Sequence, residues 1–397
     1  MLRIAIKMLW GDRAKFSGLI FGIGFTSFLV TFAMSYFCGF MTWGFALISE
    51  NPSADVWVMD PAVQSTELTA NIPDSALDRV RSIRGVDYAV PMMLGTAQAR
   101  FANGAFQAFQ VIGVDAATLA GIPPILGGAS PLVLRTPDAV LVARGGTAGK
   151  LQTPSRKRDE WPYGSSHLGV PTRTLGPGDE LQINEHRAVV MGVAQGLPRY
   201  PARPLLYTTL ANATRFLPPE PHRLTFVLVR AEPGANLHEL AARIQAQTGL
   251  KARTAADFKA DTVLWLLVNS EDVGDIAAML ILAITVGFGV TGVMLYIFTS
   301  ENLRHYALLN AMGATPRLLI RMLLVQSGLC ALLGAGLGLG ACGIASYGVS
   351  LIDYPFRMMW FTPLFSMLMV TIVSLVAAAL SVRPVLRLSP AVVFAGR

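Results

Sequence analysis

Four long apolar stretches without a charged residue constrain the fold of this chain more than any other feature. They cover Phe16–Ile48, Ile276–Ser300, Met322–Ile352 and Met358–Val382. A helix needs about 20 apolar residues to cross the hydrocarbon core of a bilayer, and each stretch is long enough. The spacing predicts an α-helical membrane protein with four transmembrane helices, one followed by three. A large water-exposed domain would lie between the first helix and the second.

The composition fits a membrane protein better than a soluble one. Of the 397 residues, 53% are hydrophobic and only 14% are charged, whereas about a quarter of the residues of a soluble domain are charged. The formal net charge of +7 raises the alternative of a nucleic-acid partner. The basic residues, however, sit at the ends of the apolar stretches and not in one patch, so we expect no nucleic acid.

The three cysteines lie inside the apolar stretches, at Cys38, Cys330 and Cys342. The domain between the first two stretches therefore has no disulfide. Thiols among apolar neighbours behave as small hydrophobic groups, so we interpret them as packing residues and not as metal ligands.

The N-terminal stretch is expected to be an uncleaved span, with residues 1–48 forming the N-terminal segment and the first transmembrane helix. A signal peptide has an apolar core of about 7–15 residues and a small-residue cleavage site. Here the apolar run is longer and ends in Ile48-Ser49-Glu50-Asn51, without an Ala-x-Ala pattern.

Lysine and arginine residues predict the orientation in the inner (cytoplasmic) membrane, because short loops rich in them stay in the cytoplasm. They gather before the first stretch, between the second and third, and after the fourth: Arg3, Lys7, Arg13, Lys15, Arg304, Arg317, Arg321, Arg383, Arg387 and Arg397. The short loop between the third and fourth stretches has only Arg357, near Asp353. Both termini are therefore expected in the cytoplasm, and residues 49–270 outside it.

Local patterns in the outer region predict a mixture of strands and helices. Ala54–Asp60 alternates like a half-buried strand, and Pro73 opens a helix whose first turn holds acidic residues. Asn103-Gly104 predicts one hairpin, and a second is expected over 178–193. A strand, a helix and a strand follow, at 224–230, 237–248 and 250–254.

Residues 49–270 are thus predicted to form an extracytoplasmic α/β domain of two subdomains, about 54–115 with 222–256, and 116–221. The stretch from Thr147 to Pro177 is rich in Gly, Pro and Ser, which predicts a mobile loop. Asp257–Asp275 has no Gly or Pro before Gly274, so the second transmembrane helix is expected to begin well before the bilayer. Residues 271–397 then hold the last three spans and the C-terminal tail.

Glycine patterns inside the spans predict close helix packing and not a nucleotide site. Gly287–Gly292 satisfies Gly-x-Gly-x-x-Gly, but a dinucleotide fingerprint follows a strand, and this run lies in an apolar helix. A second glycine-rich run follows at Gly334–Gly340. Small residues let helix backbones approach closely, within the chain or in a dimer. The residues assigned to this role are Gly287, Gly292, Gly334, Gly336, Gly338 and Gly340.

No motif predicts a catalytic, cofactor or metal site, so we do not expect an enzyme. Gly145–Leu151 resembles a phosphate loop, but Arg144 replaces its first glycine and Leu151 replaces its Ser or Thr. His238-Glu239 begins a zinc-protease pattern whose second His would fall at Ala242. The spans also hold no charged residue that could relay ions or protons.

The loop between the second and third spans has the pattern of a short amphipathic helix at the inner membrane surface. Apolar residues recur at helical spacing over Leu303–Ala311, and Gly313 suits the end of a helix. Thr315 can cap the next helix, with Pro316 at its first position. A plain interfacial connector is the alternative interpretation.

This loop resembles that of FtsX/MacB-type ABC transporter permeases, the mechanotransmission (type VII) kind. The resemblance rests on the acid-x-x-Arg pattern that starts at Glu301 and on the run Leu309-Asn310-Ala311-Met312-Gly313-Ala314-Thr315. The tail Arg383–Ala391 resembles the ending of the family, although Val392-Val393 departs from its usual Glu-Ala. The hairpin at Gly178–Asn184 and the order of the spans also match, so the resemblance covers nearly the whole chain.

The resemblance implies a MacB periplasmic-core-like outer domain and the role of a permease subunit. Such a subunit couples ATP hydrolysis by a separate cytoplasmic ATPase dimer to movements of the outer domain, which drive export or extraction of a lipid-like or amphipathic substrate. ATP and Mg would bind to the ATPase, and this chain would hold no cofactor. A second permease copy or paralogue, membrane lipid and an optional extracytoplasmic adaptor are the other implied partners.

The resemblance also assigns ATPase coupling to a helix at 301–316. The residues expected to contact the ATPase are Glu301, Arg304, Tyr306, Leu309, Met312, Gly313 and Thr315. Two other interpretations stay open. One is a mechanotransmitting regulator of an extracytoplasmic enzyme, without transport, and the other is a channel or secondary transporter.

Overall fold

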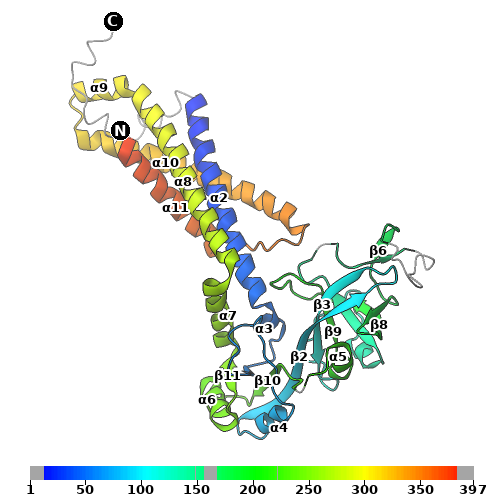
Figure 1. The fold of residues 1–397 in the computed structure, drawn as a ribbon. Helices are drawn as coiled ribbons and strands as arrows, with labels where there is room; N and C mark the ends of the chain where they lie inside the picture. The colour runs from blue at the N-terminus through cyan, green and yellow to red at the C-terminus, as the bar shows by residue number, and fades with distance from the viewer. Residues whose placement is uncertain (1–12, 148, 156–167, 221, 382–397) are drawn as a thin grey trace. The chain divides into compact units, whose positions relative to one another are not determined.

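The computed structural model describes every residue except 1–12, 148, 156–167, 221 and 382–397. The chain forms two compact units (Figure 1). The helical unit comprises Met1–Gly39, Glu271–Leu351 and Phe356–Arg397, and the α/β unit comprises Phe40–Ser270 and Ile352–Pro355.

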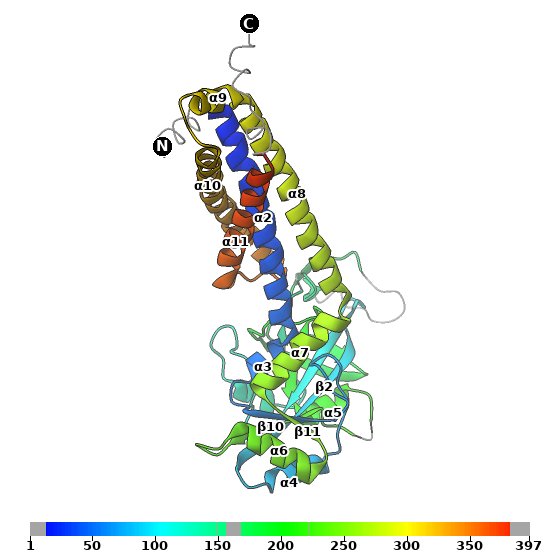
Figure 2. The ribbon, with the colours of Figure 1, turned by 90° about the vertical axis from the view of Figure 1, so that its left-hand side faces the viewer.

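Four helices of the described chain are long and apolar enough to cross a membrane. They are α2 (Arg13–Gly44), α8 (Glu271–Glu301), α10 (Pro316–Ser350) and α11 (Phe361–Ser381). Within the helical unit, α11 packs against both α8 and α10 (Figure 2). The predicted apolar stretches are confirmed as helices. Helix α8 begins earlier than its stretch, because Glu271 and Asp272 in its first turn favour the start of a helix.

Helix α2 approaches α8 and α10 at positions where only glycine fits. A Cβ atom on Gly287 of α8 would lie 2.1 Å from Cγ2 of Thr26, and one on Gly338 of α10 would lie 2.3 Å from the backbone oxygen of Gly24. A Cβ atom on Gly334 would have a side-chain neighbour at 2.6 Å. These three glycines allow the close backbone approach that favours helix association in a membrane.

The other three glycines assigned to packing differ from these. A Cβ atom on Gly292 would make an ordinary contact of 4.0 Å with Ala377, whereas Gly336 and Gly340 have no heavy atom within 4 Å in the described chain. Residues two apart on a helix point about 200° apart, so Gly336 and Gly340 face away from the side that packs on α2. Their packing role within the described chain is thus not observed, and packing in a dimer stays a prediction for these two.

Hydroxyl groups also join α2 to α10 and α11 inside the helical unit. The Oγ of Ser27 donates to the backbone oxygen of Ala335 at 3.2 Å, and the Thr31 and Ser366 hydroxyls are hydrogen-bonded at 2.7 Å. The Oγ of Ser366 contacts the backbone oxygen of Ser27 at 3.2 Å. These bonds satisfy polar groups that would be costly to bury alone in an apolar interior.

The α/β unit is built on a nine-stranded sheet in the order β11-β1-β10-β2-β3-β9-β4-β8-β7 (Figure 1). Its strands are β1 (Val56–Met59), β2 (Val86–Arg100), β3 (Phe106–Val114), β4 (Ala139–Ala143), β7 (Glu180–Ile183), β8 (His186–Val193), β9 (Leu205–Thr209), β10 (Phe226–Ala231) and β11 (Lys251–Thr254). The end of β2 also pairs with β7, with Ala99 opposite Ile183. This pairing closes β2, β3, β9, β4, β8 and β7 into a ring, which makes that part of the sheet a small barrel.

The open part of the sheet is covered on both faces. Helices α4 (Ser75–Arg81) and α6 (Leu237–Thr248) share one core with its strands. Helices α3 (Ala46–Glu50) and α7 (Ala255–Asn269) share another. Helix α5 (Leu210–Phe216) packs on β2, β3 and β9, and the short 3-10 helix η1 (Pro131–Arg135) packs on β4 and β9.

Strand β1 is buried along its whole length, so the prediction of a half-buried strand is wrong. It lies between β10 and β11. Val56 and Val58 point into the core shared with α4 and α6, whereas Trp57 and Met59 point into the core shared with α7. A strand buried on both faces has no polar side. Alternate residues of β1 therefore face two different apolar cores.

Three predicted pieces of local structure are confirmed. Strands β2 and β3 pair across the turn that contains Gly104, whose φ is +83°. Strands β7 and β8 form the second hairpin. Strand β10, helix α6 and strand β11 follow one another as expected.

The helix before the second span is broken, contrary to the expectation of one continuous helix. Helix α7 ends at Asn269, Ser270 is extended with φ of −90° and ψ of 126°, and α8 starts at Glu271. Extended backbone followed by two acidic residues is typical of a new helix start, which accounts for the break.

The strands of both predicted subdomains belong to one sheet, because β3 and β9 are parallel neighbours. The division into two subdomains stays a prediction. The predicted mobile loop at Thr147–Pro177 lies partly outside the described residues. Its described flanks, β5 (Gln152–Pro154) and β6 (Thr172–Thr174), pair as a two-stranded sheet.

Candidate functional site

The segment between α8 and α10 contains a separate short helix, α9 (Leu303–Ala311). It is shorter than the helix predicted over 301–316. Glu301 is the last residue of α8, and Pro316 is the first residue of α10, as predicted. Residues 312–315 therefore form a tight connection between two helices.

Helix α9 ends in a turn that depends on glycine. Gly313 has φ of +94°, which is a left-handed conformation. The backbone N of Ala314 donates to the oxygen of Leu309 at 3.0 Å, across the glycine. This is the bond pattern of a Schellman motif, and Leu309 and Ala314 both pack on the same small core. A residue with a Cβ atom would be strained at Gly313.

Tyr306 holds α9 against α10. Its side chain is fully buried, and its hydroxyl donates to Oε1 of Gln326 at 3.0 Å. Its ring belongs to a core with Leu319 and Leu323 of α10. Burial raises the pKa of the Tyr306 hydroxyl to about 12, so the group stays a neutral donor. Tyr306 was predicted to contact the ATPase, and that contact stays a prediction; in the described chain its side chain exposes no surface and packs α9 onto α10.

The exposed face of α9 and the following turn carries large apolar side chains. Met312 is 76% exposed and Leu308 is 44% exposed. They lie four residues apart, and therefore on one side of the helix end. Leu308 was not among the predicted contact residues, although its spacing from Met312 in the sequence could have identified it.

The other residues predicted to contact the ATPase are described by the structure to different extents. Glu301, Gly313 and Thr315 are exposed. Thr315 is the N-cap residue of α10, but its side chain makes no capping hydrogen bond, contrary to the expectation. Its backbone oxygen accepts from Leu318 N at 2.9 Å. The side chain of Arg304 lies outside the described part of the structure.

The arrangement favours contact with a protein over chemistry on a small molecule. Among the described residues, no group of three or more His, Cys, Asp or Glu side chains could hold a metal ion. The segment instead presents an apolar rim, formed by Leu308 and Met312, on a helix that the buried side chain of Tyr306 packs against α10. The basic tail at Arg383–Ala391, which also matched the family pattern, lies outside the described residues.

Two family models match the chain. The model of the FtsX-like permease C-terminal region matches residues 277–390, which include the segment between α8 and α10. The model of the MacB-like periplasmic core domain matches residues 17–247, more than half of the chain. No curated protein matches the chain.

Solved structures give distant similarities over about half of the chain. The extracellular domain of the ABC-type transporter YknZ from Gram-positive bacteria is 12% identical, with a TM-score of 0.32, and the match covers 51% of this chain and 98% of that one. The periplasmic region of MacB from Actinobacillus actinomycetemcomitans is 12% identical, with a TM-score of 0.36, and the match covers 54% of this chain and 94% of that one.

Proposed function

Because this chain belongs to the FtsX/MacB-type family of ABC transporter permeases, we propose that it couples ATP hydrolysis by a separate cytoplasmic ATPase dimer to movements of its α/β unit. ATP and Mg would bind to that ATPase. The movements would drive export or extraction of a lipid-like or amphipathic substrate.

The observation that carries the proposal is the exposed rim of α9. Leu308 and Met312 expose apolar surface next to the Gly313 turn. Exposed apolar groups on a helix held rigidly by its neighbour are typical of a protein–protein contact. The bond from Tyr306 to Gln326 and the shared core would transmit a push on α9 into α10.

The proposed topology has four spans, one before the α/β unit and three after it, with both termini in the cytoplasm. The Lys and Arg residues near the spans support this orientation. It places α9 on the cytoplasmic side, where an ATPase would lie. The absence of charged residues from the predicted spans favours transmission of movement over an ion-conducting path.

A photo-crosslinking experiment in the native host tests the ATPase contact. A photoreactive amino acid replaces Leu308 or Met312, and mass spectrometry identifies the adducts of the full chain. The control position is Ile344, which is 80% exposed on α10. An ATP-binding-cassette protein cross-linked from both α9 positions and not from Ile344 supports the proposal. Adducts only with lipid, or with an unrelated protein, contradict it.

A further inference from the structure

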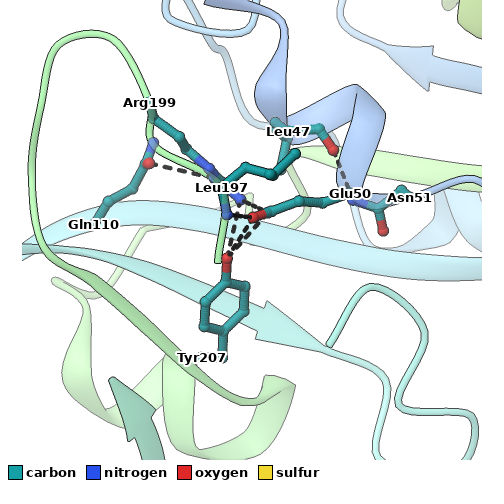
Figure 3. A network of polar contacts seen from close by, with 7 residues as sticks. All are labelled: Leu47, Glu50, Asn51, Gln110, Leu197, Arg199 and Tyr207. Carbon is teal, nitrogen blue, oxygen red and sulfur yellow. Dashed lines mark hydrogen bonds and ion pairs between the residues drawn. The ribbon is translucent and has the colours of Figure 1, made fainter. Parts of the chain in front are cut away.

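A buried ion pair in the α/β unit joins the end of α3 to a loop before β9 (Figure 3). Glu50 is the last residue of α3, and Arg199 lies between β8 and β9. Each side chain is 4% exposed, and the guanidinium of Arg199 donates to Oε2 of Glu50. The carboxylate also accepts from the backbone N of Leu197 and, at 3.0 Å, from the hydroxyl of Tyr207.

These contacts connect α3 to two strands of the barrel. Tyr207 belongs to β9, and Nη1 of Arg199 donates at 3.3 Å to Oε1 of Gln110 on β3. Strands β3 and β9 are parallel neighbours, with Gln110 opposite Leu205. A carboxylate with three donors around it is well satisfied, so the pair holds one geometry and not several.

The loop that contains Arg199 also packs against the end of α2, whose last residues belong to the α/β unit. The ring of Tyr200 lies edge-on to the ring of Phe40, with the centroids 4.5 Å apart. Trp43 and Pro198 both lie against Gly146, where a Cβ atom would meet the former at 2.9 Å and the latter at 3.2 Å. Aromatic contacts and a buried ion pair therefore act on one short stretch of chain, Phe40–Glu50.

The stretch Phe40–Glu50 is linked to the sheet in two ways, one covalent and one through side chains. The covalent route runs from Glu50 through residues 51–55 to β1, in the open part of the sheet. The route through Arg199 and Tyr207 instead reaches β9, in the closed barrel. A buried ion pair adds little net stability compared with apolar residues, and its best-attested use is to fix one arrangement of two elements.

We propose that Glu50 and Arg199 are positioning residues that transmit movement of the first span to β9 and the barrel, in parallel with the covalent path to β1. This inference rests on the proposed function, because it requires movements driven by the ATPase. It predicts that loss of the pair uncouples the barrel while the β1 path still responds.

Hydrogen exchange of the full chain in complex with its ATPase tests the inference, with nucleotide-free complex compared with complex trapped by ATP and vanadate. In the wild type, amides of both 51–59 and 195–209 should change their exchange on trapping. The double variant Glu50→Gln/Arg199→Met removes both charges of the pair, so neither partner is left as an unpaired buried ion. It should keep the change at 51–59 and lose at least two thirds, roughly a threefold reduction, of the change at 195–209.

Two further variants serve as controls. Arg187→Gln removes an exposed ion pair with Glu180 in the same unit and should behave as the wild type. Tyr207→Phe keeps the ion pair and removes one donor to Glu50 on the route to β9, so it should lose less of the response at 195–209 than the double variant does.

The remaining outcomes separate this inference from the proposed function. An unchanged response at 195–209 in the double variant overturns the inference alone, as does a wild type that responds only at 51–59. Loss of the response at both segments means that the pair merely maintains the fold, which also overturns it. A wild type that binds no ATPase, or shows no response to nucleotide, overturns the proposed function and the inference with it.

Discussion

The hydroxyl oxygen of Tyr306 lies 3.0 Å from Oε1 of Gln326, and this bond joins α9 to α10 inside a small apolar core. Tyr306 is fully buried although it belongs to a helix of nine residues between two spans. A helix this short is marginal in isolation and depends on tertiary packing. The contact therefore helps to hold α9 against α10.

Replacing Tyr306 tests that dependence. Tyr306→Phe removes one hydrogen bond and should cost about 1 kcal/mol, whereas Tyr306→Ala also leaves a cavity and should cost about 3–5 kcal/mol. Hydrogen exchange over 303–312 should rise in the same order. The control Tyr347→Phe alters a tyrosine that is 73% exposed and should change nothing. Equal exchange in all variants would show that α9 is held by other contacts.

Gly313 supplies a second test of the same segment. At φ of +94°, a β-branched residue is strongly disfavoured, although nothing in the described chain lies within 4 Å of the missing Cβ atom. Gly313→Val should therefore abolish ATPase stimulation and transport-linked function while the protein remains in the membrane. Gly313→Asn, which tolerates left-handed backbone better, should keep part of the function. Normal co-purification and stimulation of the ATPase by Gly313→Val would contradict this role.

Local residue patterns predicted where the helices and hairpins lie better than they predicted which side chains are buried. The apolar stretches and the hairpin around Gly104 follow from local residue patterns, because span length and turn conformation are local requirements. The burial of Tyr306 was not predictable in the same way. The sequence marks it as part of an amphipathic helix, but only the packing against Leu319 and Leu323 shows which side it faces.

Contacts between residues far apart in the sequence account for the other differences between the predictions and the structure. In the sequence Glu50 only follows the end of the first apolar stretch, whereas its partner Arg199 lies 149 residues away. Strand β1 looked half-buried, because nothing in its own residues shows that helices cover both faces of the sheet. Long-range pairing of this kind leaves no signal in a local window of sequence.

Close packing of α2 on α10 yields a prediction with a matched control. Gly338→Leu forces side-chain atoms against the backbone of α2, where a Cβ atom alone would lie 2.3 Å from the oxygen of Gly24. Overpacking should cost about 1–3 kcal/mol and lower the melting temperature of the full chain in detergent. Gly340→Leu, two residues away with no neighbour within 4 Å in the described chain, should leave it nearly unchanged. Equal effects of both substitutions would refute the packing role of Gly338.

The raised pKa of Glu67 predicts that the stability of the α/β unit depends on pH. Burial raises the pKa of its carboxyl from 4.5 to about 7, against the opposing attraction of Arg203 and Arg199. Between these two values the folded protein holds a proton that the unfolded chain has lost, so the contribution to stability is complete below pH 4.5 and is lost as the pH rises through about 7. The melting temperature of the full chain should therefore fall from pH 5 to pH 7.5, more steeply than in Glu67→Gln, which carries no such proton. Glu232→Gln removes an exposed carboxylate and controls for the change in net charge. Parallel pH profiles for the wild type and Glu67→Gln would show that Glu67 is ionised throughout this range.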